Sequence, residues 1–185
     1  MEYSFHCMNS MAPTGITTVL SRFLEEVEAP PVILCIGSDL AIGDCLGPVT
    51  GTLLKRRLGG HGIVYGTLKA PVTAKEVKYV GEFLKKTHPT SKLIAIDAAL
   101  GEESEIGLIK LSQSALRPGS GANKRLGKIG DVSIIGVVAQ KSNFPYSALN
   151  LTRLSPVYSM AETIARGIEG FLLNQLTKWD GGQAL

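Results

Sequence analysis

The sequence has 185 residues, enough for one domain with a full hydrophobic core. Hydrophobic residues make up 44% and charged residues 19% of the chain, which is ordinary for a globular protein. The net charge of +3 is not concentrated in a basic run, and aromatic residues are few at 6%, so we expect no nucleic-acid binding.

The spacing of apolar residues predicts alternating helices and strands after a polar lead over residues 1–13, which we expect to be flexible. Continuous apolar runs such as VILCI predict strands that are buried on both faces. The predicted elements, in chain order, are a helix over 16–27, a strand over 32–36, a helix from 47 to 58, a strand over 63–68, a helix from 73 to 84, strands over 93–97, 106–111 and 132–139, and a last helix from 155 to 171.

This alternation predicts a single α/β domain over residues 1–185, with three α/β/α layers and a mostly parallel mixed sheet. The consecutive strands over 106–111 and 132–139 indicate an antiparallel part of that sheet. No linker divides the chain, and residues 180–185 are expected to form a flexible tail.

Two aspartates fall where such a sheet binds ligands, beyond the carboxyl ends of its strands. Asp44 lies in the turn IGSDLAIGDCLGP after the first strand, and Asp97 is the last residue of the strand LIAID. If the two strands are neighbours, both carboxylates face one crevice, where paired carboxylates provide an acid and a base. Taken singly, a helix cap also explains Asp44, and an Asx turn explains Asp39.

Other chemistries find less support in the sequence. The glycine-rich turn is followed by no Gly-Lys-Ser/Thr, and no dinucleotide-binding fingerprint occurs after the first strand. Cys45 would need a nearby histidine to act as a nucleophile, and nothing in the sequence brings His61 to it. The loop RPGSGANKR carries cations that fit an anion or a peptide carboxylate, and a solvated hairpin loop explains it equally well.

Five stretches in register resemble the YyaC family of sporulation proteins from spore-forming bacteria: GSDLAIGDCLGP, VYGTL, AIDAALG, RPGSGANKRLGKIGD and NLTRLSPVYSMAETIARGI. That family is similar to the germination protease and to the hydrogenase maturation proteases, so the resemblance implies their layered hydrolase-like fold. The two proposed catalytic aspartates of the germination protease correspond to Asp44 and Asp97. In the maturation proteases the same two places hold acids that bind nickel.

The sequence also departs from these relatives. Ile42-Gly43 stands where the germination protease has Thr-Pro, and Lys69, Ala70 and Thr73 stand where the family often has acids and a histidine. A third catalytic or metal-binding group is therefore not predicted from that loop. We expect no cofactor. The resemblance to maturation proteases leaves nickel or zinc binding open, with Asp44 and Asp97 as the ligands.

Together these observations predict an aspartate-dependent peptidase of sporulation or germination that acts on peptides or small spore proteins through Asp44 and Asp97. A non-catalytic peptide- or metal-binding protein on a protease-like fold is the alternative, and hydrolysis of a small amide or nucleoside is a third hypothesis. The predicted substrate-binding residues are Asp39, Gly43, Gly47, Arg117, Gly119, Ser120, Gly121, Lys124 and Arg125.

The predicted location is the cytoplasm of the sporulating cell or the spore interior. The opening residues MEYSFHCMNSMAPTG lack the features of a signal peptide, and no apolar run approaches the roughly 18 residues of a membrane span. The cysteines Cys7, Cys35 and Cys45 show no metal-ligand spacing and fit a reducing compartment. We expect no membrane partner, and assembly into a homo-oligomer stays open.

Overall fold

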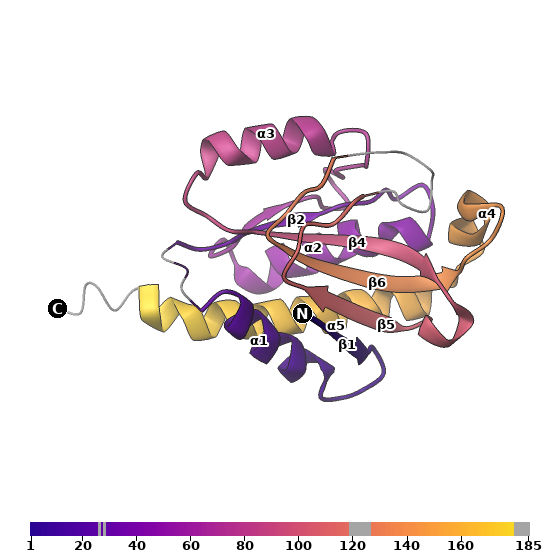
Figure 1. Cartoon of the computed structure of the whole chain (residues 1–185), viewed down its shortest axis with the longest axis horizontal. Coiled ribbons are helices and arrows are strands. Elements are labelled where there is room, and N and C mark those ends of the chain that lie inside the picture. The colour runs from indigo at the N-terminus through magenta and orange to yellow at the C-terminus, as the bar shows by residue number, and fades with distance from the viewer. Residues whose placement is uncertain (26, 28, 119–126, 180–185) are drawn as a thin grey trace.

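A six-stranded mixed sheet lies between two layers of helices in the computed structural model, which describes residues 1–25, 27, 29–118 and 127–179 (Figure 1). Helix α3 covers one face of the sheet, and α1, α2 and α5 cover the other. The elements are β1 (Glu2–His6), α1 (Ala12–Phe23), β2 (Val32–Cys35), η1 (Gly43–Cys45), α2 (Leu46–Leu58), β3 (Ile63–Tyr65), α3 (Val77–Thr87), β4 (Leu93–Gly101), η2 (Glu103–Glu105), β5 (Leu108–Ser112), β6 (Val132–Gln140), α4 (Pro145–Asn150) and α5 (Leu154–Trp179).

The strand order in the sheet is β1-β5-β6-β4-β2-β3. Strands β3, β2, β4 and β6 are parallel, whereas β5 is antiparallel to β6 and β1 is antiparallel to β5. The prediction of a three-layer α/β/α domain with an antiparallel part is confirmed. The parallel strands carry their helices on both faces, as crossover connections require.

The amino-terminal residues differ from the expected flexible lead over 1–13. Residues Glu2–His6 form β1, which pairs with β5 from Glu2 opposite Ser112 to His6 opposite Leu108. The alternating pattern of exposed and half-buried residues in β1 is that of an edge strand with one face on the core. Its partner lies about a hundred residues further along the chain, so no local signal predicts it. The predicted tail at 180–185 lies outside the described residues.

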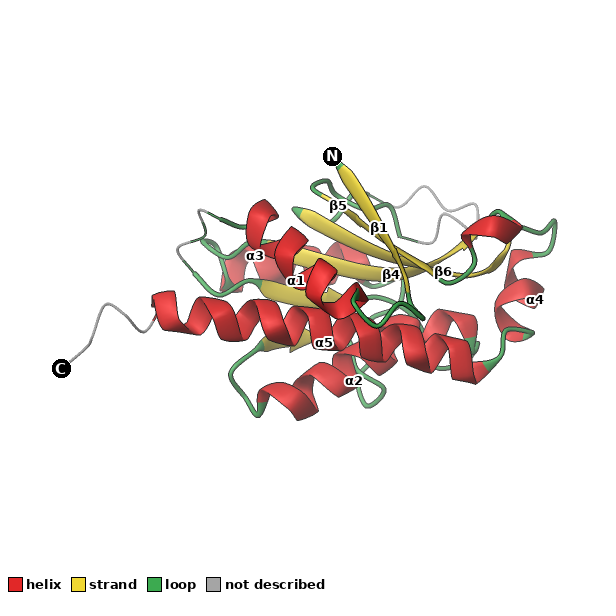
Figure 2. Ribbon diagram, turned by 90° about the horizontal axis from the view of Figure 1, so that it is seen from below, coloured by secondary structure: helices red, strands yellow, loops and turns green. Residues whose placement is uncertain are grey.

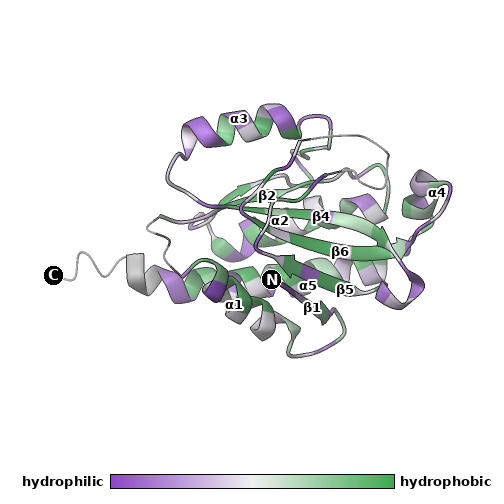
Figure 3. Cartoon of the chain, in the orientation of Figure 1, coloured by the Kyte–Doolittle hydropathy of each residue, from purple (hydrophilic) through white to green (hydrophobic). Residues whose placement is uncertain are grey.

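The core consists of two hydrophobic clusters on opposite faces of the sheet. The larger one joins α1, α2 and α5 to the sheet through residues such as Leu20, Ile96 and Phe171. Figure 2 shows α5 running along the sheet with α1 and α2 on either side of it. The smaller cluster lies under α3 and includes Leu34 and Leu84. The central strands are correspondingly hydrophobic along their length, while α3 shows polar residues on its outer side (Figure 3).

Some boundaries shift from those predicted. Strand β3 ends at Tyr65 rather than at residue 68, because Gly66 adopts a φ of +83° and turns the chain. Helix α3 begins at Val77 rather than at residue 73. In the turn before it, the Glu76 carboxylate accepts hydrogen bonds from the N–H and the hydroxyl of Thr73, both at 2.7 Å. None of the helices in the described part of the chain is long and apolar enough to cross a membrane.

Candidate active site

The end of the β2–β4 ladder determines where Asp97 lies. Strands β2 and β4 are parallel neighbours, as the prediction of a shared crevice requires, and their last register pair is Cys35 opposite Ile96. One further hydrogen bond joins the Ile36 N–H to the Ile96 carbonyl at 2.8 Å, after which β2 leaves the sheet. Asp97 is the next residue of β4, so it lies at the level where its neighbour strand ends.

Asp97 is not the last residue of its strand, which corrects the sequence-based boundary. Strand β4 continues to Gly101, because residues 97–101 keep pairing with β6 after β2 has ended. The segment Ala98-Ala99-Leu100-Gly101 has weak strand propensity by itself, and the β6 ladder keeps it extended. Asp97 therefore lies inside β4, at a step in the sheet where one of its two neighbours is lost.

The turn over residues 36–47, here called the carboxyl-edge turn, folds back tightly on the end of β2. Gly37 has a φ of +144°, and a Cβ at this position would lie 2.1 Å from the carbonyl oxygen of Asp44. The Ser38 N–H donates to that same carbonyl at 3.2 Å. At the start of α2, a Cβ on Gly47 would lie 2.0 Å from the Ile36 carbonyl oxygen. Direct backbone contacts therefore fix η1, and with it Asp44, against the end of β2.

The Asp44 carboxyl is partly withdrawn from water. Burial raises its pKa above the ordinary value of 3.8, and the Ser38 backbone N–H opposes the shift by stabilising the charged form. The N-cap residues of η1 and α2 are Ile42 and Cys45, and neither makes a side-chain cap hydrogen bond. Asp44 is therefore not at the N-cap position that would explain an aspartate before a helix. The protonated form of Asp44 is thus favoured relative to an exposed aspartate, which suits a proton donor.

The Asp97 side chain is nearly buried, with 7% of the residue exposed. Its Oδ1 accepts a hydrogen bond from the Ala98 N–H at 2.9 Å. Side chains alternate along a strand, so Asp97 is on the same face of β4 as Ala95, which belongs to the cluster under α3. Asp44 instead approaches from the start of α2, whose residues pack on the opposite face.

The structure brings the elements that carry the two aspartates together. The short helix η1 lies next to β4 at the carboxyl edge of the sheet. Helix α4 closes the outer side of η1: a Cβ on Gly43 would lie 2.8 Å from Cδ2 of Leu149. The carboxyl edge at the end of β2 and beside α4 is therefore the candidate active site predicted from the sequence.

The neighbouring residues of the carboxyl-edge turn have distinct surroundings. Asp39 is exposed. The Cys45 thiol donates to the Ile42 carbonyl at 2.8 Å, and burial together with the charges of Asp44 and Asp39 raises its pKa. A thiol in this state is a poor nucleophile. Gly43 and Gly47 are buried and pack against Leu149 and Ile36, and their predicted role in substrate binding stays a prediction.

Most of the predicted anion-binding loop lies outside the residues that the structure describes. Arg117 is exposed, whereas Gly119, Ser120, Gly121, Lys124 and Arg125 lie outside the described residues. The base of the loop is held by a pair of hydrogen bonds between Leu116 and Ile129, each 2.9 Å long. Both residues belong to the cluster under α3 that includes Ala95, so the loop starts from the face of the sheet that also carries Asp97.

The described residues near the carboxyl edge offer few ligands for a metal ion. Asp44 and Asp97 could supply carboxylate oxygens, and no third histidine, cysteine, aspartate or glutamate joins them in a metal-binding group within residues 1–25, 27, 29–118 and 127–179. Nickel and zinc sites in proteins usually combine three or more nitrogen, sulfur or oxygen ligands. The described residues alone do not fit such a site.

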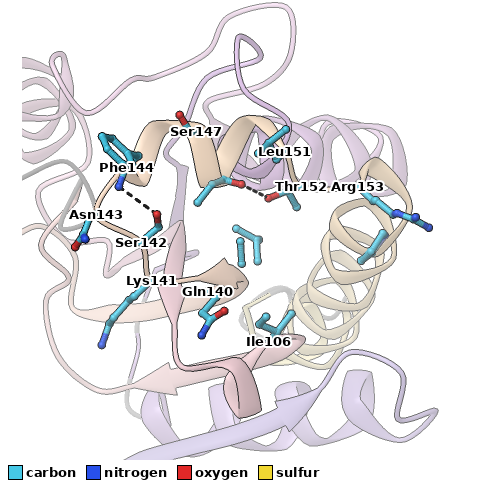
Figure 4. A pocket seen from close by; sticks show the side chains of 14 residues that line it. Ile106, Gln140, Lys141, Ser142, Asn143, Phe144, Ser147, Leu151, Thr152 and Arg153 are labelled. Carbon is cyan, nitrogen blue, oxygen red and sulfur yellow. Dashed lines mark hydrogen bonds between the residues drawn. The ribbon is translucent and has the colours of Figure 1, made fainter.

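A surface feature beside this edge was not predicted from the sequence. Helix α4 lies beyond the carboxyl ends of β4 and β6 (Figure 1). A cavity of about 1020 Å³ is lined by residues of α4, the end of β6 and the start of α5 (Figure 4). The only sequence signal is Pro145 in the first turn of the helix, a position that favours proline. A second cavity of about 660 Å³ lies between α3 and the start of β4. Neither Asp44 nor Asp97 lines these two cavities.

Comparisons with known proteins agree with the resemblance found in the motifs. Residues 4–167 match the family described as Protein of unknown function (DUF1256). The chain is 37% identical over 179 residues to the uncharacterized protein YyaC of Bacillus subtilis (strain 168), and the match covers 96% of this chain and 85% of that protein.

The fold is also found in a solved structure. The NiFe hydrogenase maturation protease HycI from Thermococcus kodakarensis KOD1 superposes with a TM-score of 0.57, covering 84% of this chain and 99% of that one. The two sequences are 18% identical, so this likeness establishes the shared fold.

Proposed function

The chain belongs to the DUF1256 family, and from this premise we propose that it is an aspartate-dependent peptidase in which Asp44 and Asp97 form the catalytic pair. The observation that carries the proposal is the contact between η1 and β4. Asp44 and Asp97 are on those two elements. Asp97 lies in β4 directly after its last register pair with β2. The protease-like fold supports the reaction class.

In the proposed mechanism the two carboxyl groups have different tasks. Asp97, as the carboxylate, takes a proton from a water molecule, whose oxygen attacks the carbonyl carbon of the scissile peptide bond. Asp44, whose pKa is raised by burial, gives its proton to the departing amide nitrogen as the carbon–nitrogen bond breaks. The proton on Asp97 then returns to Asp44 through solvent, which restores the starting state.

The biological setting of the proposal comes from the resemblance to the YyaC family and the germination protease. On that basis the substrates are peptides or small spore proteins, and the reaction takes place in the cytoplasm of a sporulating cell or inside the spore. Asp39 would assist binding from the exposed side of the carboxyl-edge turn, and the loop that begins at Arg117 would frame the substrate.

The test is cleavage of acid-soluble spore proteins by purified protein, with new amino termini identified by mass spectrometry. We expect Asp97→Asn and Asp44→Asn each to lower the rate roughly 10²- to 10⁴-fold, the usual contribution of a general acid or base. Glu103→Gln is the matched control, because Glu103 is an exposed carboxylate on η2. Cleavage by a folded Asp97→Asn variant at the rate of the control would overturn the proposal.

A second candidate function is a peptide-binding protein without turnover. The position of the cavity beside α4 supports it, since that cavity is not lined by either aspartate. For this candidate the expected result is saturable binding of a peptide with no product after long incubation. The metal-binding form of this alternative has no support from the described residues, which do not provide a third ligand.

A further inference from the structure

The cavity beside α4 is an open groove between the end of β6, α4 and the start of α5, and it is here called the α4 groove (Figure 4). Its volume of about 1020 Å³ exceeds what a single small side chain or water cluster would fill. Val138 and Gln140 of β6 line it, as do Phe144 and Leu151, which flank α4.

Large apolar side chains are exposed around the α4 groove. Leu151 is 84% exposed and Phe144 is 73% exposed, and Tyr146 and Leu154 nearby are more than half exposed. Single exposed apolar residues are ordinary on a protein surface, but a group of them around one cavity indicates a binding surface. Aromatic and leucine side chains of this kind bury the apolar side chains of a bound segment.

The charges along the α4 groove have one sign. Its lining includes Lys141 and Arg153, on opposite sides in the view of Figure 4, and no aspartate or glutamate. Lys141 pairs with Glu102 at 3.4 Å, and this pair is open to water, so it is weak. Arg153 has no ion pair among the described residues. An acidic segment therefore complements the groove electrostatically, and a basic one does not.

The α4 groove adjoins the candidate active site through α4 itself. Leu149 on one side of the helix contacts Gly43 next to Asp44, while Ser147, Ala148 and Leu151 on the other side line the groove. A helix is about 10 Å wide with its side chains, and an extended peptide advances about 3.3 Å per residue. Roughly three or four residues of a bound chain would thus lead from the groove to Asp44.

We infer that the α4 groove is a docking site for an extended polypeptide segment in which acidic residues flank apolar ones. The inference rests on the proposed function, because the occupant is the substrate that the aspartate pair would cut. Arg153 binds the acidic side chains of this segment, and Phe144 and Leu151 bury its apolar side chains. The groove thereby selects substrates, while Asp44 and Asp97 carry out the reaction.

The test is fluorescence anisotropy with a labelled peptide of roughly twelve residues, long enough to extend along the groove and past α4. Its central Leu-Phe-Leu is flanked by glutamates, and a second peptide has lysines in place of the glutamates. Binding is measured in the full chain carrying Asp97→Asn, so that cleavage does not remove the probe. We expect the acidic peptide to bind at least about tenfold more tightly than the basic one, and more weakly as salt rises.

Substitutions in the α4 groove test whether the peptide binds there. Arg153→Glu is expected to weaken binding of the acidic peptide about tenfold, and Leu151→Ser about threefold. The matched controls are Arg56→Glu at the end of α2 and Leu173→Ser on α5, which change an exposed arginine and an exposed leucine away from the groove. Both controls should bind the acidic peptide as the parent does.

Equal binding of the two peptides, or an equal loss in Arg56→Glu and Arg153→Glu, would overturn the inference. Binding that depends on Arg153, together with no cleavage by the wild-type chain, would support the docking site and contradict the proposed peptidase activity. If Arg153→Glu cleaved the acidic peptide with an unchanged KM, the proposed peptidase activity would stand and the docking site would be contradicted.

Discussion

The carboxyl-edge turn and the α4 groove lie on either side of one short helix and are built in opposite ways. In the turn, backbone contacts backbone, and the glycines at 37 and 47 leave no space for a side chain. In the groove, apolar side chains such as Leu151 and Phe144 extend into open space. A reacting pair needs fixed positions, whereas a surface that receives a polymer needs accessible apolar area. The carboxyl-edge turn is rigid and the α4 groove is open, which agrees with a proposed reaction site beside a proposed recognition site.

The largest expected effect tests the rigidity of the carboxyl-edge turn. Gly47→Ala would place a Cβ within 2.0 Å of the Ile36 carbonyl oxygen and 2.7 Å of its carbon, where no flexible side chain can move aside. We expect a loss of at least about 3 kcal/mol in the free energy of unfolding, or no folded protein. Urea unfolding followed by circular dichroism measures this loss.

The matched control for that change is Gly127→Ala. A Cβ on Gly127 meets no atom of the described residues within 4 Å, and the backbone of Gly127 has no positive φ. We expect the stability of this variant to stay within about 0.5 kcal/mol of the parent. If Gly47→Ala were as stable as Gly127→Ala, the backbone contact would not hold α2 against β2.

An intermediate effect on stability is expected from substitutions that distinguish the buried side of α4 from its exposed side. Leu149 is partly buried against the main core and next to Gly43, so Leu149→Ala is expected to cost about 1 to 2 kcal/mol of unfolding free energy. Leu151 is two residues further along and exposed, and Leu151→Ala is expected to change stability by less than about 0.5 kcal/mol. Thermal melting of the two variants compares them directly. Equal losses would show that Leu151 packs on the protein and is not available to a ligand.

The smallest effect concerns the charge on Asp44. Because its pKa in the folded chain lies above the ordinary value of 3.8, the folded state binds more protons than the unfolded state between these two pKa values. Stability therefore falls as pH rises through that interval, and the full loss persists above it. Asp44→Asn has no such loss, so its stability relative to wild type should increase from about pH 3 to about pH 7.

The change is expected to be small because solvent still reaches the Asp44 carboxyl and screens it. Unfolding curves in urea over a series of pH values measure it. The matched variant is Asp39→Asn, which alters an exposed aspartate of the same turn. An equal gain in both variants would show that burial of Asp44 is not the cause.

Much of the fold and of the candidate site follows from local patterns in the sequence. The buried runs at 32–36 and 93–97 predict neighbouring strands, and the glycines and proline that follow the first run predict a turn carrying Asp44. The remaining features depend on partners that are distant in sequence. Residues 98–101 extend β4 because β6 pairs with them, and Glu2–His6 form a strand because β5 lies alongside.

Helix α4 shows a further limit of local patterns. It has six residues, too few for a hydrophobic period to appear, and its exposed apolar residues resemble an ordinary loop in the sequence. Its position becomes meaningful only when the fold places it beside η1 and the end of β6. The proposed docking surface could therefore not be predicted by the reasoning from local patterns that singled out Asp44 and Asp97.

The contact between Gly47 and the Ile36 carbonyl has a consequence for how this protein can change over generations. The separation of α2 from β2 at this point is set by main-chain atoms, which are the same in every sequence with glycine there. Core side chains around α2 can therefore be exchanged for others of different size while the carrier of Asp44 keeps its place. Substitutions are excluded at this one glycine and tolerated around it, so residues on α4 can change without displacing the turn that carries Asp44.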